Sequence, residues 1–208
     1  MLAAQIVTSA HKTFGVRIDL REAFQAFTIE QLAQRLEAAG HGLCIAPRSP
    51  DGGVVPLSFV QERQLFLELL DPLTAVNNLA MCVRIGGSLD LARLTLSANR
   101  LLARHEALRT SFQTGRGRPG VTIAPSLEID LGLVDLRAHE PDRLAEAVRL
   151  ATLEARRPFE LDQAPLLRVR TFRLALDSHV LVVVIHHTIA DGWSLGVFLR
   201  ELFSDYRG

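Results

Sequence analysis

The feature that most constrains the fold is an apolar run near the carboxyl end of the chain. Residues 179–187 read HVLVVVIHH, in which residues 180–185 are all apolar and show no alternation with polar residues. A strand with one wet face alternates, whereas a strand covered on both faces reads as a continuous apolar run. The run therefore predicts a buried central strand, which favours an α/β fold.

The rest of residues 55–208 alternates between helix and strand patterns. Ser58 is expected to cap a helix that ends near Leu70, and Asp90 is expected to cap a second helix. Ser194 is expected to cap the last helix. Further strands are expected at 77–87, 108–113, 120–125 and 166–174, and a further helix at 141–157. This order predicts a mixed sheet.

The first 54 residues have a different character. Residues 1–40 show helical apolar spacing, and Thr28 with Gln31 forms a capping box at the start of a helix. Residues 41–54 contain two prolines and three glycines without periodicity, so we expect a linker there.

Composition limits the partners and the compartment. Lys+Arg 23 balance Asp+Glu 23, so charge gives no reason to expect nucleic acid or an anionic membrane as the main partner. Cys44 and Cys82 are isolated, which favours a reducing compartment. The chain shows no signal peptide, and no apolar run approaches the roughly 20 residues of a membrane helix. We therefore expect a cytoplasmic protein.

Two adjacent histidines end the apolar run, and an Asp-Gly pair follows in IHHTIADGWS, residues 185–194. Side chains alternate along a strand, so His186 and His187 are expected to point to opposite faces. Gly192 is expected to let the backbone bend sharply after Asp191, because glycine tolerates left-handed conformations. A histidine held at the rim of a sheet suits acid–base chemistry, since its ring titrates near neutral pH.

Other interpretations of the two histidines stay open. Both rings can be packing residues with satisfied hydrogen bonds. A zinc site needs a third ligand, but His179 lies roughly 26 Å from His187 along the strand at about 3.3 Å per residue. The two cysteines belong to no paired motif.

The segment HHTIADGWS resembles the HHxxxDG motif of condensation domains from nonribosomal peptide synthetases. Residues 57–72, LSFVQERQLFLELLDP, resemble the first conserved motif of that family, and residues 104–112, RHEALRTSF, resemble the second. The resemblance covers residues 55–208 and implies the N-terminal lobe of a chloramphenicol acetyltransferase-like α/β fold. It also implies that the domain is truncated, because the family's active-site tunnel lies between two related lobes.

Residues 1–40 resemble the C-terminal helices of a peptidyl carrier protein, on the segment LAAQIVTSAHKTFGVRIDLREAFQAFTIEQLAQRLE. In that family the serine that bears 4'-phosphopantetheine lies in a GGxS motif directly before these helices. The resemblance implies a partial, all-α carrier segment that lacks the attachment serine. It implies no cofactor bound by this chain and 4'-phosphopantetheine on partner carrier proteins.

The resemblance also assigns roles within the motifs. His187 is placed in the tunnel, where it acts as a general base or positions the amine and stabilises charge. Asp191 is expected to form an ion pair with Arg109 of the second motif, or alternatively with Arg63. Trp193 is expected to pack beside the helix start. The residues with implied structural roles are His186, Asp191, Gly192 and Arg109.

The implied reaction is peptide-bond formation, in which an amine on an acceptor carrier attacks an acyl thioester on a donor carrier. The expected partners are both peptidyl carrier proteins, the C-terminal lobe and adjacent synthetase modules, with no nucleic acid and no membrane. One alternative is a non-catalytic module that docks carriers or other synthetase domains, and another is a relative of epimerisation domains. Without the second half of the tunnel, the isolated chain is expected to be inactive.

Overall fold

The computed structural model describes residues 9, 13, 28–38, 55–71, 74–113, 119–139 and 141–208. The chain divides into two compact units, Met1–Gly52 and Gly53–Gly208. In the first unit, α3 (Ile29–Ala38) begins where the capping box predicts it, since the Gln31 amide donates to Thr28 Oγ1 at 3.2 Å. The predicted linker at 41–54 and most of the segment before Thr28 lie outside the described residues.

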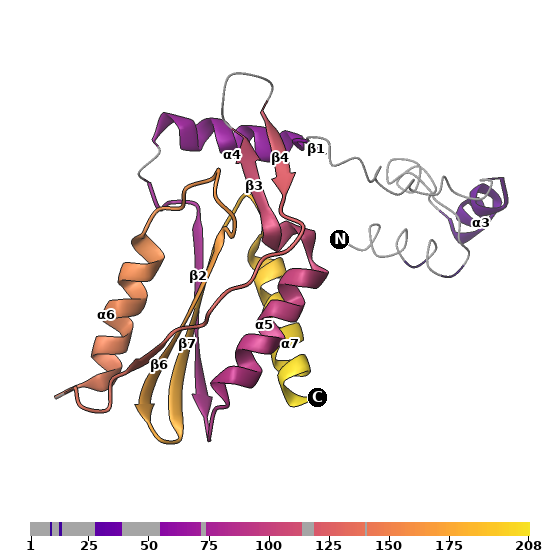
Figure 1. Ribbon diagram of the computed structural model, residues 1–208. Coiled ribbons are helices and arrows are strands. Elements are labelled where there is room, and N and C mark those ends of the chain that lie inside the picture. The colour runs from indigo at the N-terminus through magenta and orange to yellow at the C-terminus, as the bar shows by residue number, and fades with distance from the viewer. Residues whose placement is uncertain are drawn as a thin grey trace. The chain divides into compact units, whose positions relative to one another are not determined.

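A four-stranded sheet forms the centre of the second unit, in the strand order β2-β7-β6-β5 (Figure 1). Its strands are β2 (Asn78–Gly86), β7 (Ser178–His186), β6 (Leu167–Ala175) and β5 (Leu133–Asp135). The β2–β7 and β7–β6 pairs are antiparallel, whereas β5 runs parallel to β6. The prediction of an α/β fold with a mixed sheet is confirmed.

Helices cover both faces of this sheet (Figure 1). One face carries α6 (Arg143–Arg156), and the other carries α5 (Leu91–Arg104) and α7 (Gly192–Arg207). Alternate residues of β7 divide between these layers: Val180, Val182 and Val184 lie with α6, and Leu181, Val183 and Ile185 lie with α5 and α7. This two-sided cover explains why the strand does not alternate in sequence.

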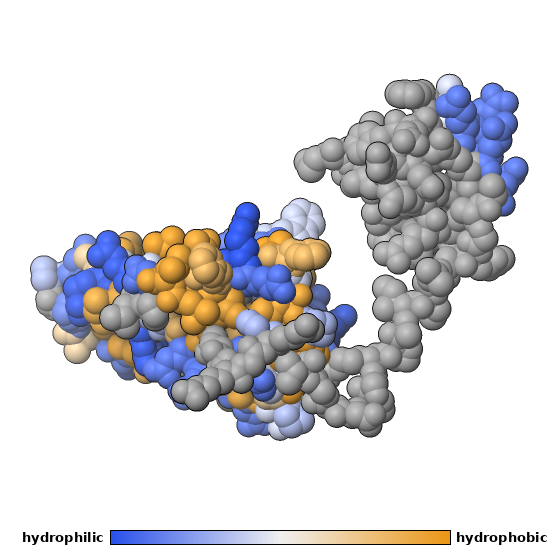
Figure 2. Space-filling view, turned by 90° about the horizontal axis from the view of Figure 1, so that it is seen from above, coloured by the Kyte–Doolittle hydropathy of each residue, from blue (hydrophilic) through white to orange (hydrophobic). Residues whose placement is uncertain are grey.

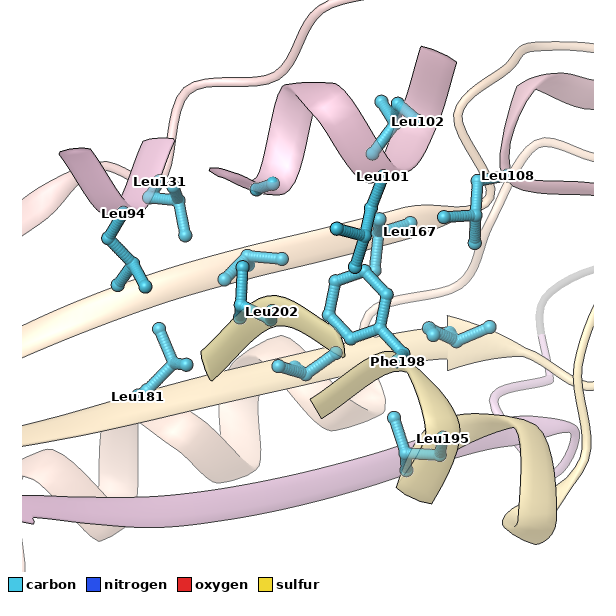
Figure 3. Close-up of a cluster of buried hydrophobic side chains, with 14 residues drawn as sticks. Leu94, Leu101, Leu102, Leu108, Leu131, Leu167, Leu181, Leu195, Phe198 and Leu202 are labelled. Atoms are coloured by element: carbon cyan, nitrogen blue, oxygen red, sulfur yellow. The ribbon is translucent and has the colours of Figure 1, made fainter. Parts of the chain in front are cut away.

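The central strand is buried along nearly its whole length. Every residue from His179 to His186 is buried, as the unbroken apolar run predicts. Figure 3 shows the cluster on the α5 and α7 side, where side chains from both helices point toward the strands; the labelled residues include Leu94, Leu101, Leu181, Leu195, Phe198 and Leu202. Each fully buried large aliphatic side chain contributes about 1.5–3 kcal/mol to the free energy of folding. The carboxyl end of β7 is therefore a rigid platform for the residues that follow it.

A second, three-stranded sheet has the order β1-β4-β3. Its strands are β1 (Val55–Pro56), β4 (Gly120–Ile123) and β3 (Thr110–Gln113), and β3 with β4 confirms the two short strands expected there. A short 3₁₀ helix, η1 (Glu106–Arg109), leads from α5 into β3. The separation into two sheets was not predicted, because a local pattern identifies a strand but not its partner.

Helix α4 (Phe59–Leu70) packs beside the small sheet through Leu65. It begins at Ser58 as predicted: Ser58 Oγ accepts from the Gln61 amide at 3.3 Å, and Gln61 Oε1 accepts from the Ser58 amide at 3.0 Å. Its exposed apolar side chains are Phe59, Val60, Phe66, Leu67, Leu69 and Leu70. Figure 2, seen from above relative to Figure 1, shows hydrophobic residues gathered at the end of the unit where α4 lies.

The remaining helices begin at acidic caps. Asp90 Oδ1 accepts from the Arg93 amide at 3.0 Å, which confirms the predicted start of α5. Asp142 accepts from the amides of Leu144 and Ala145 at the start of α6. Within the described ranges, no helix is long and apolar enough to cross a membrane.

Candidate active site at the end of the central strand

The two histidines lie where β7 ends and a tight turn leads into α7. The Ile189 amide donates to His186 O at 3.1 Å, which closes the turn. The His187 amide donates to Asn77 O at 2.8 Å, which ties the turn to the start of β2. The backbone at both histidines is thus held by the sheet and by its neighbouring strand.

The His186 ring is buried and fully engaged. The residue is 2% exposed, and its ring forms a T-shaped pair with the Phe159 ring, with centroids 5.9 Å apart. Its Nδ1 lies 2.8 Å from Thr188 Oγ1 and 3.3 Å from the Thr188 amide, while Nε2 lies 3.2 Å from Glu68 Oε1. An amide can only donate and a carboxylate accepts, so Nδ1 is the acceptor and Nε2 carries the proton.

Burial disfavours the charged form of this ring. It lowers the pKa of His186 below its ordinary value, against the opposing attraction of the Glu68 carboxylate. Nδ1 accepts from the Thr188 amide, which only the neutral ring can do, so the ring serves as a hydrogen-bonding packing residue. The structural role expected for His186 is consistent with this setting.

The His187 ring has a different environment. The residue is only half-buried, and its Nδ1 lies 2.8 Å from Ala190 O. A carbonyl oxygen accepts, so Nδ1 carries the proton in the neutral ring and Nε2 keeps its lone pair. No group in the described part of the chain hydrogen-bonds Nε2. The ring is thus oriented by one nitrogen and available for chemistry through the other.

Asp191 caps the last helix. Its Oδ1 accepts from the Ser194 amide at 2.7 Å and from Ser194 Oγ at 2.6 Å, and these bonds lower the pKa of its exposed carboxyl. The prediction that Ser194 caps α7 is wrong. The extended backbone belongs to Asp191, which occupies the capping position, and Ser194 lies inside the first turn.

The expected ion pair between Asp191 and Arg109 is not formed, so that prediction is wrong. Arg109 is 8% exposed and donates to carbonyl oxygens of the α5 end and of the segment after β4, namely those of Leu102, Ala103, Ala124 and Pro125. Arg63, the alternative partner, is exposed on α4, and no ion pair among the described residues joins it to Asp191. The second motif therefore serves packing around β3 and α5.

The conformation expected for Gly192 is also wrong. Gly192 is the first residue of α7, and the positive-φ glycines among the described residues are Gly87, Gly132 and Gly208. A Cβ at position 192 would meet no atom within 4 Å. The turn bends through the extended backbone of Asp191 and the hydrogen bond from Ile189, so it needs no left-handed residue.

Sequence reasoning missed Glu68 and Asn77. Glu68 lies on α4, is 5% exposed, and accepts a hydrogen bond from Asn77 Nδ2 as well as from His186. A signal was present: Glu68 lies three residues after Leu65 and four after Gln64, on the buried face of the helix. A carboxylate at such a position needs a partner.

A pocket of about 220 Å³ opens beside the turn, between η1 and the start of α7. It is lined mainly by apolar side chains, including Ile185, Ile189, Val197 and Phe198, with His105 and Trp193. Trp193 is 80% exposed, so the expectation that it packs beside the helix start is wrong. His187 does not line this pocket, and no group of three or more His, Cys, Asp or Glu in the described ranges is arranged to hold a metal ion.

Comparisons with known proteins agree on one family. The family model described as Condensation domain matches residues 51–208. One of the linear gramicidin synthase proteins of Brevibacillus parabrevis is 36% identical over 214 residues, which cover 99% of this chain and 3% of the synthase. Surfactin synthase subunit 2 from Bacillus subtilis is 35% identical over 212 residues, which cover 100% of this chain and 6% of the synthase.

Solved structures share the fold. The first condensation domain of the CDA synthetase matches with a TM-score of 0.69 at 27% identity, over 76% of this chain and 41% of that chain. A chain in the complex of the X-domain and OxyB from teicoplanin biosynthesis matches with a TM-score of 0.67 at 28% identity, over 77% of this chain and 34% of that chain. This chain thus spans less than half of these solved chains and a small part of the synthases.

Proposed function

This chain belongs to the condensation-domain family of nonribosomal peptide synthetases, and we propose that it supplies the catalytic histidine of a domain that forms peptide bonds. The observation that carries the proposal is the hydrogen bond from His187 Nδ1 to Ala190 O at 2.8 Å. That bond orients the ring and leaves Nε2 as a proton acceptor at the rim of the sheet.

The proposed reaction joins two substrates that are tethered to carriers. The amine nitrogen of the acceptor aminoacyl group forms a bond to the thioester carbonyl carbon of the donor, the carbon–sulfur bond breaks, and the sulfur leaves as a thiol. The nitrogen loses one proton. His187 Nε2 accepts this proton and returns it to the sulfur, or it holds the amine by a hydrogen bond while the proton passes to the sulfur directly.

The tether is part of the substrates in this proposal. The donor and acceptor peptidyl carrier proteins, each bearing 4'-phosphopantetheine, are the partners, and adjacent synthetase modules supply them. The similarity to gramicidin and surfactin synthases supports this assignment.

We also propose that the active site is completed by a further part of a condensation domain. Two observations support this: the match covers 41% of the solved chain of the CDA synthetase condensation domain, and α4 exposes an apolar face that includes Phe59 and Phe66. Exposed apolar patches of this kind mark interaction surfaces. We therefore expect the 208 residues alone to bind or pack against partners but not to catalyse peptide-bond formation.

Residues 1–40 are proposed to be the end of a carrier protein that precedes the condensation domain. The alignment with the gramicidin synthase covers 99% of the chain and so extends before residue 51. Residues 1–40 contain no GGxS sequence, so they cannot accept a pantetheine arm. Incubation with a phosphopantetheinyl transferase and labelled coenzyme A should leave this segment unlabelled in mass spectrometry, and stoichiometric labelling would refute the assignment.

A second candidate function is protein docking without catalysis. The match to a chain in the complex of the X-domain and OxyB supports it, because that structure shows a relative of the same fold with a protein partner. The two candidates differ in what His187 does. In a docking module the ring has no chemical role.

The test is made in the full-length synthetase that carries this chain. We expect His187→Ala to abolish most condensation between loaded carriers while carrier binding and thermal unfolding stay unchanged. The control is His139→Ala, because His139 is an exposed histidine of the same unit, whereas His179 is buried. Condensation by His187→Ala at the rate of His139→Ala would favour docking over catalysis.

A further inference from the structure

The buried carboxylate of Glu68 takes no part in the reaction proposed above, yet it lies next to the motif. It comes from α4, and its side chain is 7% exposed. Placing a carboxylate in such a position costs free energy unless hydrogen bonds compensate. Here Oε1 accepts from His186 Nε2 at 3.2 Å and from Asn77 Nδ2.

These two donors lead to His187 by separate routes. Asn77 donates to Glu68 with its side chain and accepts the His187 amide with its backbone oxygen at 2.8 Å. His186 is the residue directly before His187 in the chain. Glu68 therefore holds His186, which precedes His187, and Asn77, whose backbone oxygen accepts a hydrogen bond from the His187 amide.

The carboxylate also decides which nitrogen of His186 is protonated. With the proton on Nε2, the ring donates to Glu68 and its Nδ1 accepts from the amide and hydroxyl of Thr188. With the proton on Nδ1, two protons would face each other at Thr188, and the Nε2 lone pair would face the carboxylate. Only the first tautomer satisfies all three groups.

The position of Thr188 in turn affects the orientation of the His187 ring. Thr188 lies inside the turn that presents Ala190 O to His187 Nδ1 at 2.8 Å. Gln61 of α4 adds a second contact from the same helix, since its Nε2 donates to Thr188 O at 3.4 Å. Helix α4 thus holds the turn at two points.

We propose that Glu68 is a positioning residue, which through His186, Asn77 and the turn at Thr188 holds the His187 ring with its proton on Nδ1. The inference rests on the proposed function of His187. It adds a residue from the first motif to the machinery of the HHxxxDG motif, across 118 positions of sequence.

The test uses three variants. Glu68→Leu removes the acceptor and puts an apolar side chain of similar size in its place. Glu68→Gln keeps an oxygen that can accept from both His186 and Asn77. Glu62→Gln is the matched control, because Glu62 is an exposed glutamate of the same helix.

The first readout is the tautomer of His187, measured by ¹⁵N NMR of labelled imidazole rings in the 208-residue chain and assigned with His187→Gln. In the parent and in Glu62→Gln, the protonated nitrogen should be Nδ1. Glu68→Leu should give a mixture of tautomers, and Glu68→Gln should restore the Nδ1 form. A role in folding alone would change the fraction of folded protein but not the tautomer of the folded ring.

The second readout is condensation kinetics in the full-length synthetase. Glu68→Leu should lower kcat about tenfold or more, the size of effect seen when a metal-ligating histidine loses the hydrogen-bond partner that orients it, with little change in the KM for the acceptor carrier. Glu68→Gln should recover most of kcat. A Glu68→Leu protein with the parental tautomer and the parental kcat overturns the inference. If His187→Ala itself retains activity, the proposed function fails instead, and the NMR result still reports on the network.

Discussion

Arg109→Met tests the reassignment of the second motif from ion pairing to packing. The guanidinium joins the end of α5 to the segment after β4. Its Nε donates to Leu102 O at 2.8 Å and its Nη1 to Pro125 O at 3.1 Å, and further bonds reach Ala103 O and Ala124 O. Methionine keeps much of the side-chain length but removes every donor.

The size of the effect follows from these contacts. A hydrogen bond to a charged group contributes about 1.5–3 kcal/mol, so the bonds to Leu102 and Pro125 together contribute roughly 3–6 kcal/mol. Methionine avoids the cost of burying a charge, which offsets part of the loss. We expect the free energy of unfolding to fall by about 3 kcal/mol, a large share of the about 5–15 kcal/mol of an ordinary domain.

The measurement is urea unfolding followed by circular dichroism. Arg63→Met is the control, because Arg63 is exposed, and its effect should stay within about 0.5 kcal/mol. Asp191→Asn combined with Arg109→Met should give only the sum of the two single effects, since no ion pair among the described residues links them. An Arg109→Met protein as stable as the control, or a strong departure from additivity, would refute the reasoning.

Three further predictions concern stability. Burial lowers the pKa of His186 below its ordinary value of 6.5, so the contribution of the neutral ring to the free energy of unfolding is fully present above about pH 6.5 and is lost as the pH falls toward the folded-state pKa. Urea titrations at several pH values should show this decline in stability, and His186→Gln should make the decline smaller. Leu181→Ala, in the core and 0% exposed, should cost about 2–5 kcal/mol in the same assay, whereas Leu176→Ala, 75% exposed, should cost little. Gly192→Ala should not destabilise the fold, because the residue is helical and its Cβ would meet nothing within 4 Å; a marked fall in thermal midpoint would contradict the geometry of the turn.

The sequence predicted those features that depend on local patterns. The apolar run identified β7 as a strand covered on both faces, because a strand buried on both faces reads as a continuous apolar run without a period-two pattern. Ser58 and Asp90 marked the starts of α4 and α5, since a capping side chain bonds to amides only three residues away. The motif around His187 also identified the family, which the comparisons confirm.

Contacts between distant segments were decided by the tertiary structure alone. Arg109 was expected at Asp191 but donates to backbone carbonyls, which no residue pattern marks as acceptors. Glu68 meets His186 across 118 positions, and Asn77 enters the same network from a third segment. Local periodicity reports which face of an element is buried, whereas the partner that a buried polar group finds depends on how the elements pack. By itself, therefore, the sequence determined that β7 is covered on both faces and where α4 and α5 begin, and only packing determined which side chains lie against the two histidines at the end of β7.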